Sequence, residues 1–164
     1  MLLFKNFLSV SLLFLCTSVV ASPKSDMVTK QLEQVIKDFG DAIKEKDEQK
    51  FTNLFYSKNR PWLGVNAKKR KGKLPSQEGL VYASHLGFIS WIATSNEQME
   101  EKFWDIDIKT DGEIASIYFK YSFHIGDYKY NWGDEAWDLV KTADGWKIVS
   151  VIYSTTENPE PRQT

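Results

Sequence analysis

Hydrophobic residues recur every three or four positions in the first part of the chain, with separations of 4, 3, 1, 3 and 4. This spacing is typical of one face of an amphipathic α-helix. The residues of this face are Val28, Leu32, Val35, Ile36, Phe39 and Ile43. Asp47 is a typical N-cap for a second, short helix with Phe51, Leu54 and Phe55 on one face, and Pro61 prevents its continuation.

The next two segments differ in their apolar content. Residues 64–79 hold three glycines, a proline and the basic cluster of residues 68–73, so we predict a loop there. Residues 80–93 are mostly apolar, and we predict a third helix, although Gly87 weakens this interpretation.

From Lys102 onward the hydrophobic period changes to two, which is the pattern of β-strands. Three two-residue turn signals interrupt this pattern: Asp111-Gly112, Gly126-Asp127 and Asp144-Gly145. Such signals between apolar runs are typical of hairpins. We therefore predict an antiparallel four-strand meander over about 102–110, 113–125, 128–141 and 146–154. Helices followed by such a meander make an α+β fold.

The turns also predict the register, because a loop of fixed length leaves one partner for each residue. In the first hairpin, Ile108 is expected opposite Ala115 and Trp104 opposite Phe119. This register places many aromatic residues on one concave inner face, namely Trp104, Phe119, Tyr121, Phe123, Tyr128, Tyr130, Trp132 and Trp137.

The alternation slips in the third strand, where an unbroken pattern would turn Asp138 inward and Trp137 outward. One extra residue near Gly133-Asp134, a β-bulge, restores the pattern. Glu135 and Trp137 then face inward, and the last hairpin agrees because it pairs Trp137 with Ile152.

Glu135 becomes the only carboxylate on this predicted inner face of the meander. A carboxyl group among aromatic side chains is desolvated, which raises its pKa and suits it to acid–base chemistry or to binding a polar ligand group. Tyr121 is the inner-face residue that would act with it as a proton partner. The alternative is a solvated Glu135 at the rim of the sheet.

The predicted outer face carries apolar residues as well, and a contiguous apolar patch indicates a partner. We expect a homodimer through this face, with Tyr118, Val149, Val151 and Tyr153 as its contact residues. The alternative is cover by the C-terminal residues 157–164, a polar tail with two prolines.

The first residues have the pattern of a secretory signal peptide: Lys5, then an apolar run, then small residues up to Ala21. We therefore predict a signal peptide over 1–21, a domain over 22–156 and a polar tail over 157–164. The protein would then be exported to the periplasm or the extracellular space, without a stable membrane anchor after cleavage. Cleavage would also remove Cys16, the only cysteine.

Composition excludes some function classes. The formal net charge of −1 argues against nucleic-acid binding. A metal site needs three or four converging ligands, and His124 has no such company, so we expect neither a metal nor a cofactor. His85 is either a satisfied polar group within a helix or a pocket residue. Six tryptophans exceed what packing requires, which favours a role for some of them in a pocket.

The order of these elements resembles the nuclear transport factor 2-like superfamily, which includes SnoaL-like domains. The resemblance is carried by residues 28–55, VTKQLEQVIKDFGDAIKEKDEQKFTNLF, and 133–154, GDEAWDLVKTADGWKIVSVIYS. It implies a cone-like, cystatin-like roll in which the bent sheet wraps the helices and leaves a pocket. It implies little about activity, because the superfamily includes isomerases, dehydratases, transport adaptors and oligomerisation modules. No catalytic residue of the family is matched here.

Three functions stay open. The preferred hypothesis is an exported domain that binds a small, partly apolar ligand without chemistry. The ligand-binding residues would be Trp62, Trp91, Trp104, Phe119, Tyr121, Glu135 and Trp137. The alternatives are an interaction module that acts through the outer face, and an isomerase- or dehydratase-like enzyme that uses Glu135 with Tyr121.

Overall fold

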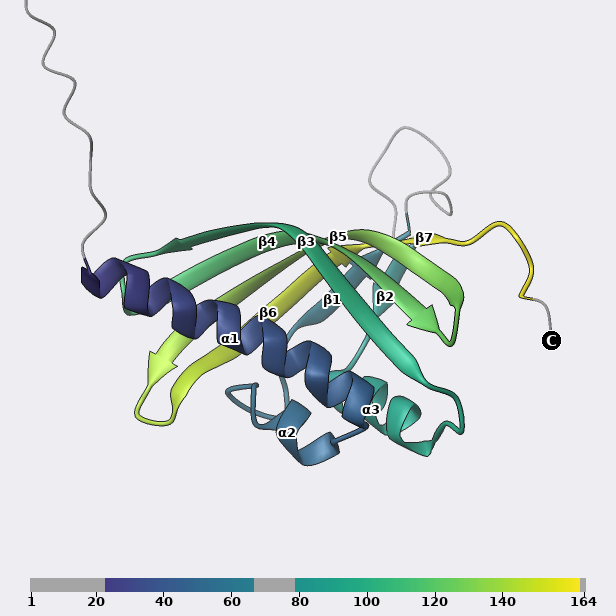
Figure 1. The fold of residues 1–164 in the computed structure, drawn as a ribbon, viewed down its shortest axis with the longest axis horizontal. Helices are drawn as coiled ribbons and strands as arrows, with labels where there is room; N and C mark the ends of the chain where they lie inside the picture. Colours follow the sequence, from purple (N-terminus) through teal and green to yellow (C-terminus); the bar gives the residue numbers. More distant parts are fainter. Residues whose placement is uncertain (1–22, 67–78, 163–164) are drawn as a thin grey trace, which may run out of the picture.

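The computed structural model describes residues 23–66 and 79–162. The predicted signal peptide and the basic cluster at 68–73 lie outside these residues. Helices α1 (Pro23–Glu45), α2 (Glu48–Thr52) and α3 (His85–Thr94) lie on one side of a curved sheet (Figure 1). None of the helices in the described part is long and apolar enough to span a membrane.

The sheet has seven strands within the described residues, in the order β2-β1-β6-β5-β4-β3, and β7 pairs with β5. Strand β1 runs parallel to β6, and the other pairs are antiparallel. The strands are β1 (Trp62–Val65), β2 (Leu80–Tyr82), β3 (Met99–Thr110), β4 (Ile114–Ile125), β5 (Tyr128–Thr142), β6 (Gly145–Ser154) and β7 (Thr156–Glu157). The predicted meander is β3 to β6, and three short strands extend it.

The helical predictions are confirmed with two corrections, the first being that α2 ends at Thr52, so Leu54 and Phe55 follow the helix instead of lying on its face. All six residues of the predicted apolar face of α1 are buried, and Asp47 caps α2 by accepting a hydrogen bond from the Lys50 amide at 2.8 Å. The third helix begins only at His85, because Leu80–Tyr82 forms β2 instead. Strands β1, β2 and β7 span two to four residues, too few for an alternating pattern to be recognised.

The first hairpin has a longer turn than predicted. The Asp111 carboxylate accepts hydrogen bonds from the amides of Glu113 and Ile114, so Thr110 pairs with Ala115 and Ile108 pairs with Ile117. A bulge between Trp104 and Asp107 then reverses the faces. As a consequence Phe103 packs against the core, while Trp104 is 40% exposed, so the expected inward position of Trp104 is wrong.

The predicted bulge in the third strand of the meander exists, but its extra residue is Tyr130 and not Gly133-Asp134. His124 pairs with Lys129, and Phe123 already pairs with Asn131. Beyond this bulge Phe119 pairs with Glu135, as predicted, and Glu135 is buried.

The bulge also turns Trp132 to the outer face, contrary to prediction. There the Lys129 ammonium lies 4.4 Å from the centre of the Trp132 ring.

The turn of the last hairpin is Ala143-Asp144 and not the predicted Asp144-Gly145, and a bulge between Asp138 and Leu139 changes the outer face. Val151 pairs with Trp137 and is 1% exposed, and Tyr153 packs against the core, so neither belongs to an outer patch. Val149 is partly buried, whereas Tyr118 is exposed as expected. The homodimer stays a prediction.

Aromatic side chains fill the space between α1, α2 and the central strands β4 and β5. The Phe39 ring of α1 lies 4.7 Å from the rings of both Phe51 and Trp137. Phe119 meets Trp137 edge-on at 4.9 Å and is fully buried. Tilted and edge-on pairs of this kind add to the stabilisation from burial.

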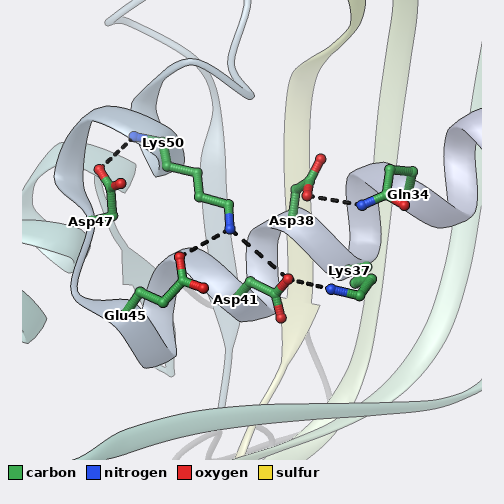
Figure 2. A network of polar contacts seen from close by, with 7 residues as sticks. All are labelled: Gln34, Lys37, Asp38, Asp41, Glu45, Asp47 and Lys50. Atoms are coloured by element: carbon green, nitrogen blue, oxygen red, sulfur yellow. Dashed lines mark hydrogen bonds and ion pairs between the residues drawn. The ribbon is translucent and has the colours of Figure 1, made fainter.

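A network of polar contacts links α1 to α2 (Figure 2). The Lys50 ammonium lies 3.0 Å from the Glu45 carboxylate and 3.9 Å from that of Asp41, which also pairs with Lys37. These ion pairs lie at the surface, where water screens them, so they add little to the stability of the fold. The corner between the two helices is therefore held mainly by the buried rings.

Gly133 allows the end of β6 to pass close to β5. A Cβ atom at this position would lie 2.0 Å from the Ser154 carbonyl oxygen, which no side chain movement can relieve. The same Ser154 carbonyl accepts a hydrogen bond from the Tyr121 hydroxyl at 3.1 Å.

We predict that Gly133→Ala destabilises the protein by several kcal/mol, because the backbone of β6 must move to admit the methyl group. Gly87→Ala is the matched control: its Cβ would meet nothing nearer than 3.9 Å within α3, so we expect a gain of about 0.5–1 kcal/mol. Urea unfolding of both variants measures the effect. Equal stability of Gly133→Ala and the wild type would contradict the described path of β6.

Candidate functional site

A cavity of about 340 Å³ opens between β1, α3 and the inner face of the sheet. This volume lies within the range of about 300–1,000 Å³ that small-molecule pockets have. Most of its wall is aromatic, and three polar side chains face it. The lining residues are Trp62, Ala83, Phe88, Trp91, Glu101, Tyr121, Phe123, Tyr130, Asn131, Glu135 and Tyr153.

The aromatic wall depends on α3. Ser84 caps this helix through the Gly87 amide, and the helix then presents Phe88 and Trp91 to the sheet. The Phe88 ring lies 5.4 Å from that of Trp62 and 5.7 Å from that of Phe123. Side chains from α3, β1 and β4 therefore form one continuous apolar wall.

Glu135 of β5 is 4% exposed and lines this cavity. The indole N–H of Trp137, two residues along the same face, donates a hydrogen bond to one carboxylate oxygen at 2.5 Å. Burial raises the pKa of Glu135 to about 7, and the Trp137 hydrogen bond partly opposes this rise. The predicted desolvated carboxyl is therefore present.

A second carboxyl, Glu101 of β3, lines the same cavity and is 9% exposed. Burial raises its pKa well above the usual range, and the charge of Glu135 raises it further. Among the residues that the structure describes, no basic side chain contributes to the pKa of either group. Two carboxyl groups thus share a largely apolar cavity without a cationic partner from the described residues.

Two phenols lie beside the carboxyl pair. Burial raises the pKa of Tyr121, and it raises the pKa of Tyr153 to about 12, so both are neutral at neutral pH. The Tyr121 hydroxyl is occupied by its hydrogen bond to the Ser154 carbonyl. The side-chain oxygen of Asn131 is buried and has no hydrogen-bond partner among the described residues, so it is an acceptor available to a ligand.

The structure brings together four of the seven residues that the sequence nominates for ligand binding. Trp62, Trp91, Tyr121 and Glu135 line the cavity. Phe119 and Trp137 are fully buried in the core beside it, and Trp137 acts on the site through Glu135.

Glu101 is the principal residue that the sequence analysis missed, and the inner face therefore has two carboxylates instead of one. The strand pattern begins at Lys102 in the prediction, and its unbroken alternation points Trp104 inward, whereas the bulge between Trp104 and Asp107 turns Phe103 inward instead. An inward Phe103 would have placed Glu101 on the same face, because residues two apart share a face of a strand.

The two histidines lie outside the cavity wall. His85 is 1% exposed and stacks on Phe55 with ring centres 4.1 Å apart. Burial, and then the charge of Arg60, lower its pKa, so the ring is neutral at neutral pH. His124 bonds the Ser122 hydroxyl at 2.9 Å. Within residues 23–66 and 79–162, no three His, Cys, Asp or Glu side chains group as metal ligands.

Solved structures share this architecture. An NTF2-like protein of unknown function from Shewanella baltica is 17% identical, with a TM-score of 0.55 over 81% of this chain and 97% of its own. An NTF2-like protein with a cystatin-like fold from Novosphingobium aromaticivorans is 10% identical, with a TM-score of 0.58 over 78% of this chain and 81% of its own. A Streptomyces avermitilis protein of the NTF2-like family, whose name proposes a dehydratase, is 14% identical. Its TM-score is 0.57 over 81% of this chain and 99% of its own.

These likenesses establish the class of structure. The chain has the α+β, cystatin-like fold of the NTF2-like proteins, as the sequence predicts. No protein-family profile and no curated protein matches the sequence. At these identities the likeness defines the fold, and the function has to be argued from the cavity.

We predict that Glu135 makes stability depend on pH. Its pKa rises from 4.5 to about 7 on folding, so its contribution is fully present below pH 4.5 and is lost as the pH rises to about 7. Relative to Glu135→Gln, the wild type should lose roughly 3 kcal/mol of unfolding free energy across this window. Urea unfolding from pH 4 to 8 measures the difference.

Glu33→Gln, which replaces an exposed carboxylate on α1, is the control and should follow the wild-type curve. Parallel curves for the wild type and Glu135→Gln between pH 4.5 and 7 would show that Glu135 is solvated.

Proposed function

We propose that the protein binds a small, partly apolar ligand in this cavity, and that Glu101 and Glu135 orient the polar part of the ligand. The observation that carries the proposal is the pair of buried carboxyls in an aromatic cavity. Buried polar groups are costly unless they find partners, so two buried carboxyl groups in one cavity favour a role in recognition. The aromatic wall would supply most of the contact area.

The signal-like segment at the start of the chain supports a site of action outside the cytoplasm. We therefore place the ligand in the periplasm or the extracellular space. The experiment follows from this: the protein is purified from its native compartment, and mass spectrometry identifies what co-elutes with it.

The matched pair Ala83→Leu and Ala143→Leu tests where the ligand binds. Ala83 lines the cavity, whereas Ala143 is exposed in the turn between β5 and β6. We expect the co-eluting compound with the wild type and Ala143→Leu, and at least a tenfold loss with Ala83→Leu because the added side chain occupies the cavity. No compound with the wild type, or equal amounts with both variants, would contradict binding in the cavity.

Acid–base catalysis is a second candidate, favoured by the pKa of Glu135 of about 7. A general base with a pKa near the working pH is efficient, and Asn131 offers a polar contact nearby. The Streptomyces avermitilis protein of similar fold, whose name proposes a dehydratase, agrees with such chemistry.

The ligand identified by co-elution separates the two functions. A binding protein returns the compound unchanged after incubation, whereas an enzyme converts it. In the second case Glu135→Gln should lower the turnover by about 10²–10⁴-fold, because glutamine transfers no proton. Conversion at the wild-type rate by Glu135→Gln would exclude Glu135 as the base.

A further inference from the structure

We propose that the ligand is an organic cation, an amine or quaternary ammonium with an attached apolar group, held by Glu101 and Glu135 within the aromatic walls. The inference rests on the proposed function and names its ligand class. It depends on three features of the cavity: two buried carboxyl groups, no cationic partner for them among the described residues, and walls made of rings.

The carboxyl groups belong to different strands but to one cavity. Glu101 comes from β3 and Glu135 from β5, and each is more than nine-tenths buried. Trp137 donates to one oxygen of Glu135, and Glu101 has no hydrogen-bond donor among the residues described. The charge of Glu135 raises the pKa of Glu101, so the two carboxyl groups interact electrostatically within the cavity. Both carboxylates can be charged at little cost only when a positive group lies between them.

The nearby basic side chains of the described segments are engaged elsewhere. Lys44 and Lys102 pair with Glu100, which lies on the face of β3 opposite to Glu101. Arg60 bonds Ser57 and covers the Tyr56 ring. The titratable side chains that line the cavity are Glu101 of β3, Tyr121 of β4, Tyr130 and Glu135 of β5, and Tyr153 of β6. The neutral His85 of α3 stacks on Trp62, which lines the cavity as well. Among the described residues, no positive charge faces the carboxyl pair, and in the proposed complex the ligand supplies this charge.

The aromatic walls decide between kinds of cation. The faces of Trp and Tyr rings attract cations within about 6 Å of their centres, most strongly where water is excluded. A metal ion would need further oxygen ligands, and the described residues contain no group of three His, Cys, Asp or Glu side chains that could hold one. An organic cation is stabilised by both kinds of lining residue, because its charge contacts the carboxylates and its apolar part contacts Trp62, Phe88 and Trp91.

The pH dependence separates a cationic ligand from a neutral one. In the empty cavity the raised pKa values keep both carboxyl groups protonated at pH 5. A cation binds the ionised pair, so its affinity increases as the pH rises from 5 to 8 and protons are released on binding. A neutral hydrogen-bond acceptor would need the protonated pair, and its affinity would fall over the same range.

The test compares two probes of nearly equal shape, 2-phenylethylamine, which is protonated up to pH 8, and 2-phenylethanol, which is neutral. Titration calorimetry with the full folded domain measures both at pH 5 and pH 8. We expect the amine to bind at least about tenfold more tightly than the alcohol at pH 8, with a several-fold smaller preference at pH 5. The double variant Glu101→Gln/Glu135→Gln should lose the preference.

Glu33→Gln/Glu113→Gln removes two exposed carboxylates and should keep the preference, which controls for net charge. Circular dichroism verifies the fold of both double variants, and Glu101→Gln alone provides the test if the first pair fails to fold. Equal or tighter binding of the alcohol would overturn the inference and leave the proposed function standing. Absence of saturable binding of either probe, together with no co-eluting compound, would overturn both.

Discussion

The cavity and the core both depend on one extra residue in β5, the bulge at Tyr130. A shift of one position moves every side chain of a strand to the opposite face. Without this residue, Asp134 and Asp138 would point toward the helices, and Trp137 would point to solvent. With it, Trp137 enters the core beside Phe39 and donates its indole N–H to Glu135. The same backbone irregularity therefore stabilises the fold and sets a carboxyl group into the cavity.

The aromatic residues do two different tasks at the two ends of the cone. Around Phe39, Phe119 and Trp137 they are fully buried and pack ring against ring. Around Trp62 and Trp91 they leave a cavity with two carboxyl groups on its wall. Burial of these carboxyls reduces stability when they are charged, and the aromatic core offsets that cost. Trp62 and Trp91 are the tryptophans that line this cavity, and Trp137 belongs to the core beside it.

Helical spacing predicted the buried face of α1, and alternation with turn residues predicted the meander from β3 to β6 and the inward Glu135. They failed where the backbone departs from regular pairing: the side chain of Asp111 lengthens a turn, and bulges between Trp104 and Asp107 and between Asp138 and Leu139 change the register. A bulge changes no residue type, so only packing against the helices selects it. Glu101 was missed for this reason, since its face depends on how Phe103 packs.

The most direct test of the account is a ¹³C NMR titration of the glutamate side-chain carboxyl carbons. We expect two glutamate carboxyl groups to stay protonated well above pH 4.5, and the resonance of Glu135 to titrate near pH 7. Each of the two resonances should disappear in the corresponding glutamine variant, and Glu101 should titrate at a lower pH in Glu135→Gln because the charge of Glu135 is gone. Titration of all glutamates near pH 4.5 would contradict the buried carboxyl pair on which the proposed site depends.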